Sequence, residues 1–267
     1  MSAGVTGGPA ALGGKVAVVT FAGEGIGRSV AQVLAAEGAA VVCVFGEQVA
    51  GEIRAGGGRA ISCNTDVSEM AGGSEVVDLA LSEFGRLDIL VNSAAGLDRT
   101  NDPVWGGGIG DMSPEDFYAS VRRGLKATFT PTRHAAAVFR RQRSGRIVNI
   151  TSDDGLGIPG SAARAMVSEG IVGMTRTVGR DMGKYGVTCN AVVADDPGAA
   201  AALTASLCTD ALANVNGRTL GARHGSIFLY QEPEIAAGVH KWGGLNLDEL
   251  DSLVPRLLAP AQEQESP

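Results

Sequence analysis

Short apolar runs alternate along the chain with longer segments in which apolar residues recur every three or four positions. The runs are rich in β-branched residues and nearly continuous, which is typical of parallel strands covered on both faces. Six of these runs are expected to be strands, at residues 16–20, 40–45, 60–63, 89–92, 147–151 and 187–193. The segments between them are expected to be crossover helices, at 26–37, 47–54, 73–84, 113–141 and 161–184. This alternation predicts an α/β protein with a Rossmann-type, doubly wound parallel sheet.

The pattern thins after the sixth run. There we expect a helix over 199–212, a last strand within 218–230 and a short terminal helix over 245–258. The sheet would then have about seven strands, with helices on both of its faces. The chain has 267 residues, 45% of them hydrophobic, which suffices for one core, and no internal repeat or linker indicates a second domain. We therefore expect a flexible tail over 1–14 and a single domain over 15–267.

Charge and cysteine content exclude several classes of function. The net charge is −7 and the basic residues are scattered, so binding to a nucleic-acid backbone is not expected. The four cysteines lie far apart without C-x-x-C spacing, which predicts free thiols, no metal site and a reducing, cytoplasmic setting. No apolar run has the length of a membrane span, and the start of the chain is unlike a signal peptide.

The turn after the first strand reads T-F-A-G-E-G-I-G-R over residues 20–28. It resembles the T-G-x-x-x-G-I-G turn of the short-chain dehydrogenase/reductases, where small residues let a pyrophosphate approach backbone N–H groups at a helix N-terminus. Phe21 stands in place of the first glycine, at a turn where glycine tolerates angles that other residues avoid. Two interpretations stay open: a dinucleotide still binds, or the turn is only scaffold. The resemblance implies that NAD(P) would contact Thr20, Gly23, Gly25, Ile26 and Gly27.

Three further positions of the resemblance concern the cofactor. The second strand ends in Phe45-Gly46-Glu47, where the family has an Asp or a nearby basic residue, and Glu47 is expected to open the next helix. Asp66-Val67 resembles the family's adenine-contacting pair, so Asp66 and Val67 are implied to bind the cofactor. Asn92 is implied likewise, at the start of N-S-A-A where the family reads N-N-A-G, and Ala95 adds a methyl group to that motif.

The family's chemistry requires a serine, a tyrosine, a lysine and an asparagine. A phenol, whose pKa in water is about 10, is a useful base at neutral pH only beside a cation such as that lysine. Ser152 falls on the catalytic serine at the end of I-V-N-I-T-S. The Y-x-x-x-K frame, fixed by the following G-I-V-G, places Arg164 on the tyrosine and Ser168 on the lysine, and Gly124 replaces the asparagine. Arg164 cannot act as a base because a guanidinium stays protonated.

The remaining candidates offer no substitute. The three tyrosines, Tyr118, Tyr185 and Tyr230, lie outside the expected catalytic positions. The family's P-G after the sixth strand is replaced by Asp195-Asp196, which we expect to form a solvated turn, although a carboxylate pair or metal site is the alternative. The segment that follows is too short for a full substrate lid.

The resemblance runs from about Lys15 to the end, and is strongest to an actinobacterial branch resembling hydroxyacyl-CoA dehydrogenases. It implies a non-catalytic (pseudoenzyme) subunit that pairs through the helices at 113–141 and 161–184, as a homo-oligomer or with an active paralogue. The alternative is a repurposed or atypical NAD(P)-dependent oxidoreductase that acts on an acyl-CoA or polyketide-like substrate. In that alternative Ser152, Arg164 or the nearby Asp153 and Asp154 would support the chemistry, with Arg164 binding a carboxylate or polarising a carbonyl.

Overall fold

The computed structural model describes residues 10–93, 109–223 and 225–258. One eight-stranded sheet, in the order β3-β2-β1-β4-β5-β6-β7-β8, forms the centre of the fold. The strands are β1 (Val16–Val19), β2 (Ala40–Val44), β3 (Arg59–Cys63), β4 (Ile89–Ser93), β5 (Gly145–Thr151), β6 (Val187–Ala194), β7 (Thr219–Arg223) and β8 (Ser226–Leu229). Among these described strands, seven are parallel and β8 pairs antiparallel with β7. The predicted doubly wound α/β sheet is confirmed.

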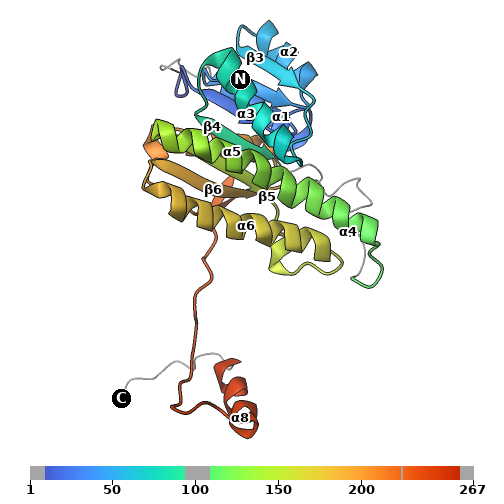
Figure 1. Ribbon diagram of the computed structural model, residues 1–267, viewed down its shortest axis with the longest axis vertical. Helices are drawn as coiled ribbons and strands as arrows, with labels where there is room; N and C mark the ends of the chain where they lie inside the picture. Colours follow the sequence, from blue (N-terminus) through green and yellow to red (C-terminus); the bar gives the residue numbers. More distant parts are fainter. Residues whose placement is uncertain (1–9, 94–108, 224, 259–267) are drawn as a thin grey trace. The chain divides into compact units, whose positions relative to one another are not determined.

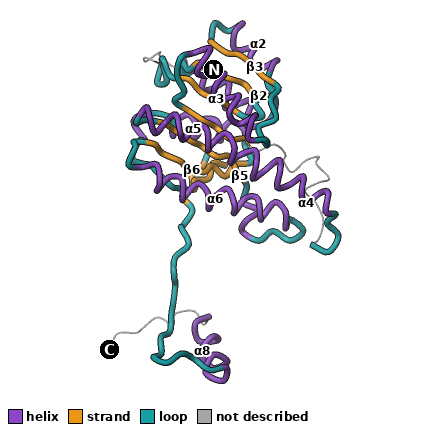
Figure 2. Tube along the Cα trace, viewed as in Figure 1, coloured by secondary structure: helices purple, strands orange, loops and turns teal. Residues whose placement is uncertain are grey.

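Helices cover both faces of the sheet. The helical segments are α1 (Gly25–Ala36), α2 (Glu47–Ala55), α3 (Met70–Phe84), α4 (Pro114–Ser120), η2 (Val121–Lys126), α5 (Ala127–Gln142), η3 (Asp153–Leu156), α6 (Ala162–Gly183), α7 (Pro197–Leu207), η4 (Asp210–Leu212) and α8 (Leu247–Leu258). Side chains of α1, α2 and α7 join one hydrophobic cluster, and those of α3, α5 and α6 join the cluster on the opposite face. In Figure 1 and Figure 2, α5 and α6 run side by side across the near face.

The strand order places a crevice at the carboxyl ends of β1 and β4. The chain runs from β1 outward to β2 and β3, then returns to β4 on the other side of β1. In open parallel sheets such a reversal leaves a crevice outside the carboxyl ends of the strands, where ligands bind. The turn at 20–24 and the end of β4 lie at this reversal.

Two elements differ from the sequence expectation in detail. The last strand within 218–230 is a hairpin of β7 and β8, and Gly225, with φ of 79°, lies in its turn. The long helix at 113–141 begins as predicted, where the Ser113 hydroxyl accepts a hydrogen bond from the Asp116 backbone N–H and Pro114 is the first residue. Its middle is the π-helical segment η2, which the periodicity did not reveal.

The chain divides into two compact units, Met1–Tyr230 and Gln231–Pro267. The first contains the sheet and its covering helices. The second contains α8, whose leucines and valine line one side of the helix. The described part of the chain contains no helix that is both long and apolar enough to cross a membrane.

Candidate functional site

The turn between β1 and α1 follows the backbone path of a phosphate loop, but its residue 21 is phenylalanine and not glycine. Phe21 has a φ of 49°, the left-handed region that the first glycine of the motif would occupy freely, and Gly25 has a φ of 53°. Left-handed backbone costs an L-residue about 1–2 kcal/mol. A Cβ on Gly27 would lie 2.2 Å from the Phe21 carbonyl oxygen, so this glycine allows α1 to pack closely on the turn. The backbone path of the motif is therefore kept at residue 21 at the cost of strain.

The Phe21 ring stacks on Phe45, the first residue after β2. The ring centroids are 5.5 Å apart and the planes differ by 20°. Phe45 also has a positive φ, 57°, and is 39% exposed. Phe21 is half-buried and packs against the hydrophobic cluster that contains Val44 and Val67. The two positions at which the sequence departs from the dinucleotide motif are therefore joined in one aromatic contact.

The Asp66 carboxylate is engaged by the protein itself. Its Oδ1 accepts hydrogen bonds from the Ser68 hydroxyl at 2.6 Å and the Ser68 backbone N–H at 3.0 Å, and its Oδ2 pairs with the Arg122 guanidinium. The hydrogen bonds from Ser68, assisted by Arg122, hold the pKa of Asp66 below its usual value. Lys126 makes a parallel ion pair with Glu69 at 3.0 Å. Arg122 and Lys126 thus tie η2 to the segment that follows β3.

Asn92 and Val67 are buried in the interior. The Asn92 Nδ2 donates to Thr132 Oγ1 at 2.9 Å and to Asn149 Oδ1 at 2.8 Å, and Asn149 in turn donates to Thr175. Val67 is fully buried. The structure places both residues near the carboxyl ends of the strands, as the resemblance implies, but their side chains serve the core.

The other residues implied for the cofactor lie along the same crevice. The Thr20 hydroxyl accepts a hydrogen bond from the Ser93 backbone N–H at 3.0 Å, which joins the ends of β1 and β4. Ile26 packs on the cluster beneath α1, and a Cβ on Gly23 would lie 2.4 Å from the Phe45 carbonyl oxygen. Glu47 begins α2, as predicted. Ala95 lies outside the described residues.

Arg164, at the position of the family's tyrosine, forms an ion pair with Asp154. Arg164 Nε lies 2.9 Å from Asp154 Oδ2, and the two side chains are only 6% and 2% exposed. The Ser152 hydroxyl donates to the same carboxylate oxygen at 2.5 Å. Two donors from the catalytic positions therefore converge on one buried carboxylate. The sequence placed Asp154 near Ser152 but gave no reason to pair it with Arg164, which lies ten residues further along the chain.

Ser168 and Gly124 stand at the positions of the family's lysine and asparagine, and both pack closely against their neighbours. Ser168 is buried, its hydroxyl donates to the Ser152 carbonyl, and it lies 3.0 Å from the Thr151 hydroxyl. Gly124 lies in η2, and a Cβ there would come within 2.2 Å of Val167 Cγ1. No room is left beside Val167 for the side chain that the family carries at this position.

The two aspartates after β6 have separate structural roles. Asp196 caps α7, since its Oδ1 accepts from the backbone N–H groups of Gly198 and Ala199 at 2.9 and 3.2 Å. Asp195 pairs with Arg223 Nε at 3.1 Å, and Arg223 Nη2 lies 2.9 Å from Asp153 Oδ2. Within the described ranges no group of three or more His, Cys, Asp or Glu side chains is arranged to hold a metal ion. Helix α7 follows where the lid of the family would begin.

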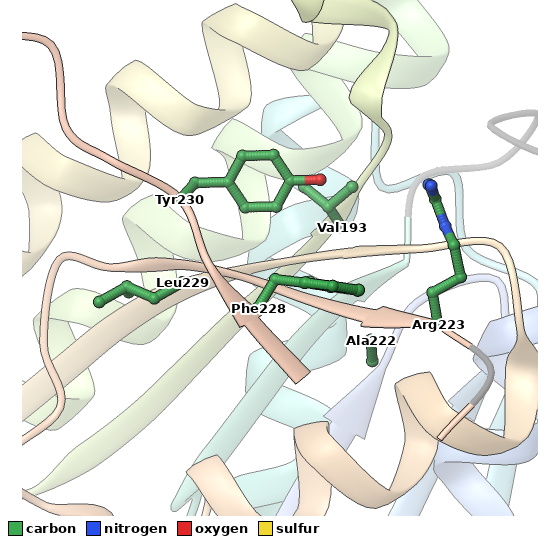
Figure 3. A pocket seen from close by; sticks show the side chains of 7 residues that line it. Val193, Ala222, Arg223, Phe228, Leu229 and Tyr230 are labelled. Atoms are coloured by element: carbon green, nitrogen blue, oxygen red, sulfur yellow. The ribbon is translucent and has the colours of Figure 1, made fainter. Parts of the chain in front are cut away.

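A pocket of about 270 Å³ borders this cluster, and Tyr230 lines it. Gly221 leaves space over β7 that the rings of Phe228 and Tyr230 occupy, since a Cβ there would lie 3.0 Å from Tyr230 Cε2. Figure 3 shows the Tyr230 hydroxyl directed toward Val193, with Arg223 along the same side of the hairpin. Burial, with the charge of Asp153, raises the pKa of Tyr230 above its usual value. Tyr230 is thus near the β5 and β6 ends, which its place in the sequence did not indicate.

The other two tyrosines lie elsewhere. Tyr118 is an exposed residue of α4 that contacts Phe117 edge-to-face. Tyr185 follows α6, with Arg143 and Lys184 over its ring. Neither has a contact with the residues at the family's catalytic positions among those the structure describes.

A family model described as short chain dehydrogenase matches residues 15–204. The chain belongs to the short-chain dehydrogenases. It is 34% identical over 235 residues to a 3-oxoacyl-(acyl-carrier-protein) reductase of Synechocystis, a match that covers 85% of this chain and 88% of that protein. It is 33% identical to the hydroxy(phenyl)methylsuccinyl-CoA dehydrogenase subunit BbsD of Thauera aromatica, over 67% of this chain and 71% of the relative. A crystal structure of a short chain dehydrogenase from Mycobacterium avium superposes with a TM-score of 0.85 and 30% identity, covering 93% of this chain and 96% of that one.

Short-chain dehydrogenases are oxidoreductases that generally bind NAD(P), so family membership indicates where a cofactor site is expected in this fold. The structure brings Thr20, the glycines, Asp66 and Asn92 to the expected crevice. It also brings Ser152, Arg164 and Ser168 together beside it. The sequence did not identify the partners that these groups contact, which are Phe45 for Phe21, Arg122 for Asp66 and Asp154 for Arg164.

Proposed function

We propose that this protein is a non-catalytic member of the short-chain dehydrogenases that acts as a subunit of an oligomer of such chains. The observation that carries the proposal is the buried ion pair of Arg164 with Asp154, on the same carboxylate oxygen that accepts the Ser152 hydroxyl. In the family the corresponding place holds a phenol that exchanges a proton. A buried guanidinium stays protonated and cannot take that role.

The other catalytic positions support the same conclusion. A hydroxyl at Ser168 cannot depress a phenol pKa or provide a cation as a lysine does. Its proton is already donated to the Ser152 carbonyl. The Ser152 hydroxyl is directed to Asp154 and not kept for a substrate oxygen. The residues of the site therefore hold one another in place, and none is poised to move a proton.

The residues present do not fit NAD(P) as the resemblance would hold it. The Phe21 ring projects from the position of the first loop glycine, and the Asp66 carboxylate is bound to Ser68 and Arg122. No lysine is present at residue 168 to orient a nicotinamide ribose. We propose that the protein does without the cofactor, and we derive no chemical step through it.

Exposed apolar side chains on α4, α5 and α6 support the subunit role. They include Phe117, Phe129 and Met166, which are 38%, 45% and 37% exposed. Ile171 and Val172, also on α6, are buried inside the chain. A partner subunit, either a second copy or an active paralogue, would cover the exposed side chains. BbsD is named as a subunit of a dehydrogenase, which sets a precedent among the relatives.

The test is to measure turnover and assembly on the same preparation. We expect no oxidation of NADH or NADPH with 3-oxoacyl thioesters, the substrate type of the Synechocystis relative. We also expect a dimer or larger assembly that Phe129→Asp and Met166→Asp dissociate, with Met70→Asp, at an exposed apolar site on α3, as the matched control. Saturable turnover, or a monomer at all concentrations together with no complex with a paralogue, would refute the proposal. The free thiols of all four cysteines are consistent with the cytoplasmic location that we propose.

The alternative, an atypical oxidoreductase for acyl-CoA or polyketide-like substrates, is favoured by one observation. Tyr230 and Arg223 line the same pocket, and Arg223 also pairs with Asp153, so a phenol and a cation border one space near the ends of β5 and β6. In this case Tyr230→Phe would abolish a turnover that Tyr118→Phe leaves intact. Relatives that act on acyl-(acyl-carrier-protein) and acyl-CoA substrates define the compounds to screen.

A further inference from the structure

The end of the crevice that the family resemblance implies for adenosine is occupied by two phenylalanines of this chain. Phe21 follows β1 at the point where the strand order reverses, and Phe45 follows β2 beside it. The cluster against which Phe21 packs contains Val67, which the resemblance implies for the adenine, and Val44, the residue before Phe45. An aromatic ring of the protein thus lies among the residues that would enclose a bound base.

We propose that the Phe21 ring, held by Phe45, fills the adenosine end of the dinucleotide site and closes it to adenine nucleotides. The proposal rests on the proposed loss of cofactor use and gives it a physical cause. A phenyl ring and a purine are both flat and apolar on their faces, so a ring among these apolar side chains excludes a base from the same space.

Backbone strain indicates that the pair is maintained together. In the described part of the chain, three residues other than glycine have a positive φ, and two of them are Phe21 and Phe45. Strained conformations persist only where surrounding contacts determine them, and they gather at functional sites. Ring stacking at 5.5 Å supplies such a contact for both turns at once.

The carboxylate at the same end is also engaged by the protein itself. Asp66 accepts from Ser68 and pairs with Arg122. A nucleotide entering the crevice would have to displace both the ring and these partners. The rings are the barrier that substitution can remove without exposing a buried charge, because the backbone path at residue 21 already suits glycine.

The experiment measures binding of ADP-ribose by calorimetry to four proteins: the natural chain, Phe21→Gly, Phe45→Asp and the double variant. ADP-ribose contains the adenosine and the pyrophosphate but no nicotinamide, so Arg164 and Ser168 do not affect the result. Phe45→Asp restores the residue type that the resemblance expects at the end of β2. Phe84→Ala, which removes another half-buried ring that packs against the same hydrophobic cluster, at the end of α3, is the matched control.

We expect no saturable binding by the natural chain or by Phe84→Ala. Phe21→Gly should bind saturably, with a dissociation constant roughly tenfold or more below the lower limit set for the natural chain, the scale of one ring contact, and the double variant should bind more tightly still. Tight binding of ADP-ribose by the natural chain would overturn the proposal. So would a lack of gain in the folded variants, judged by circular dichroism and melting. If Phe21→Gly does not fold, Phe45→Asp alone decides, because it frees one side of the Phe21 ring.

The two proposals can fail separately. Turnover by the natural chain would refute the non-catalytic role, whatever the ADP-ribose result. Binding of ADP-ribose by the natural chain without turnover would refute ring filling and leave the non-catalytic role standing.

Discussion

The catalytic region and the nucleotide turn have both departed from the family pattern, but in physically opposite ways. In the catalytic region the replacements are buried and bonded to their neighbours: Arg164 to Asp154, and Ser168 to the Ser152 carbonyl. At the nucleotide turn the replacements, Phe21 and Phe45, are partly exposed, strained and joined by one stacking contact. One region has become part of the core, whereas the other remains a loop whose shape still suits glycine.

This difference indicates how reversible each departure is. A buried charge pair can be changed only as a unit, because removing one partner leaves a buried charge uncompensated in a medium of low dielectric constant. A strained surface turn gains from a single substitution that relieves the strain. We therefore expect the catalytic region to resist single reversions and the nucleotide turn to accept them.

The largest effect is expected at the buried ion pair. Arg164→Met takes the guanidinium away from the buried Asp154 carboxylate and should lower the free energy of unfolding by about 3–5 kcal/mol. Chemical denaturation followed by circular dichroism measures this loss.

The double variant Arg164→Met with Asp154→Leu is the control for that prediction. It removes both charges, so its loss should be at least about 1.5 kcal/mol smaller than the sum of the two single losses. Additive losses would mean that the two charges do not stabilise each other, and the catalytic region would then not be harder to change by single substitutions than the nucleotide turn.

The next effect concerns Gly124, where the catalytic region closes on Val167. Gly124→Ala places a Cβ about 2.2 Å from Val167 Cγ1 and should destabilise the protein by about 1–3 kcal/mol through overpacking. Gly173→Ala on α6 is the matched control, because nothing lies within 4 Å of its added Cβ. There the same substitution should stabilise by about 0.4–1 kcal/mol. Adding Val167→Ala to Gly124→Ala should recover part of the lost stability. A lack of recovery would show that the added Cβ clashes with a residue other than Val167.

A smaller effect separates strain from ring contact at Phe21. Phe21→Gly and Phe21→Ala both remove the ring, but only glycine accepts a φ of 49° without penalty. Phe21→Gly should therefore be more stable than Phe21→Ala by about 1 kcal/mol. Equal melting temperatures for the two variants would show that the turn relaxes when the ring is lost, and that the strain is imposed by stacking alone.

The hydrophobic pattern predicted the sheet and its covering helices because strands that are buried on both faces consist almost entirely of apolar residues. It did not separate β7 from β8, because each strand has only five or four residues and the turn around Gly225 is too short to interrupt the pattern clearly. Motif spacing located Arg164, Ser168, Gly124 and Phe21 at the site. It could not supply Asp154, Arg122 or Phe45 as their partners. Those contacts join residues on different elements, and a spacing rule describes only one element at a time.

The smallest effect is expected at Asp66, because its charged partner Arg122 is exposed, whereas Arg164, the charged partner of Asp154, is buried. Arg122→Ala should cost only about 0.2–1 kcal/mol at neutral pH, because both side chains of this pair are about half exposed. The pKa of Asp66 is lowered in the folded chain, first by the Ser68 hydroxyl and then by Arg122, so the carboxylate stabilises the fold above its unfolded pKa. That contribution is lost as the pH falls below about 4 and through the folded pKa. The stability difference between the natural chain and Arg122→Ala should accordingly vanish in acid.

Lys126→Ala, which breaks the neighbouring pair with Glu69, is the control for the general effect of removing a cation from η2. A loss at neutral pH as large as that of Arg164→Met would show that the nucleotide region is as tightly closed as the catalytic one.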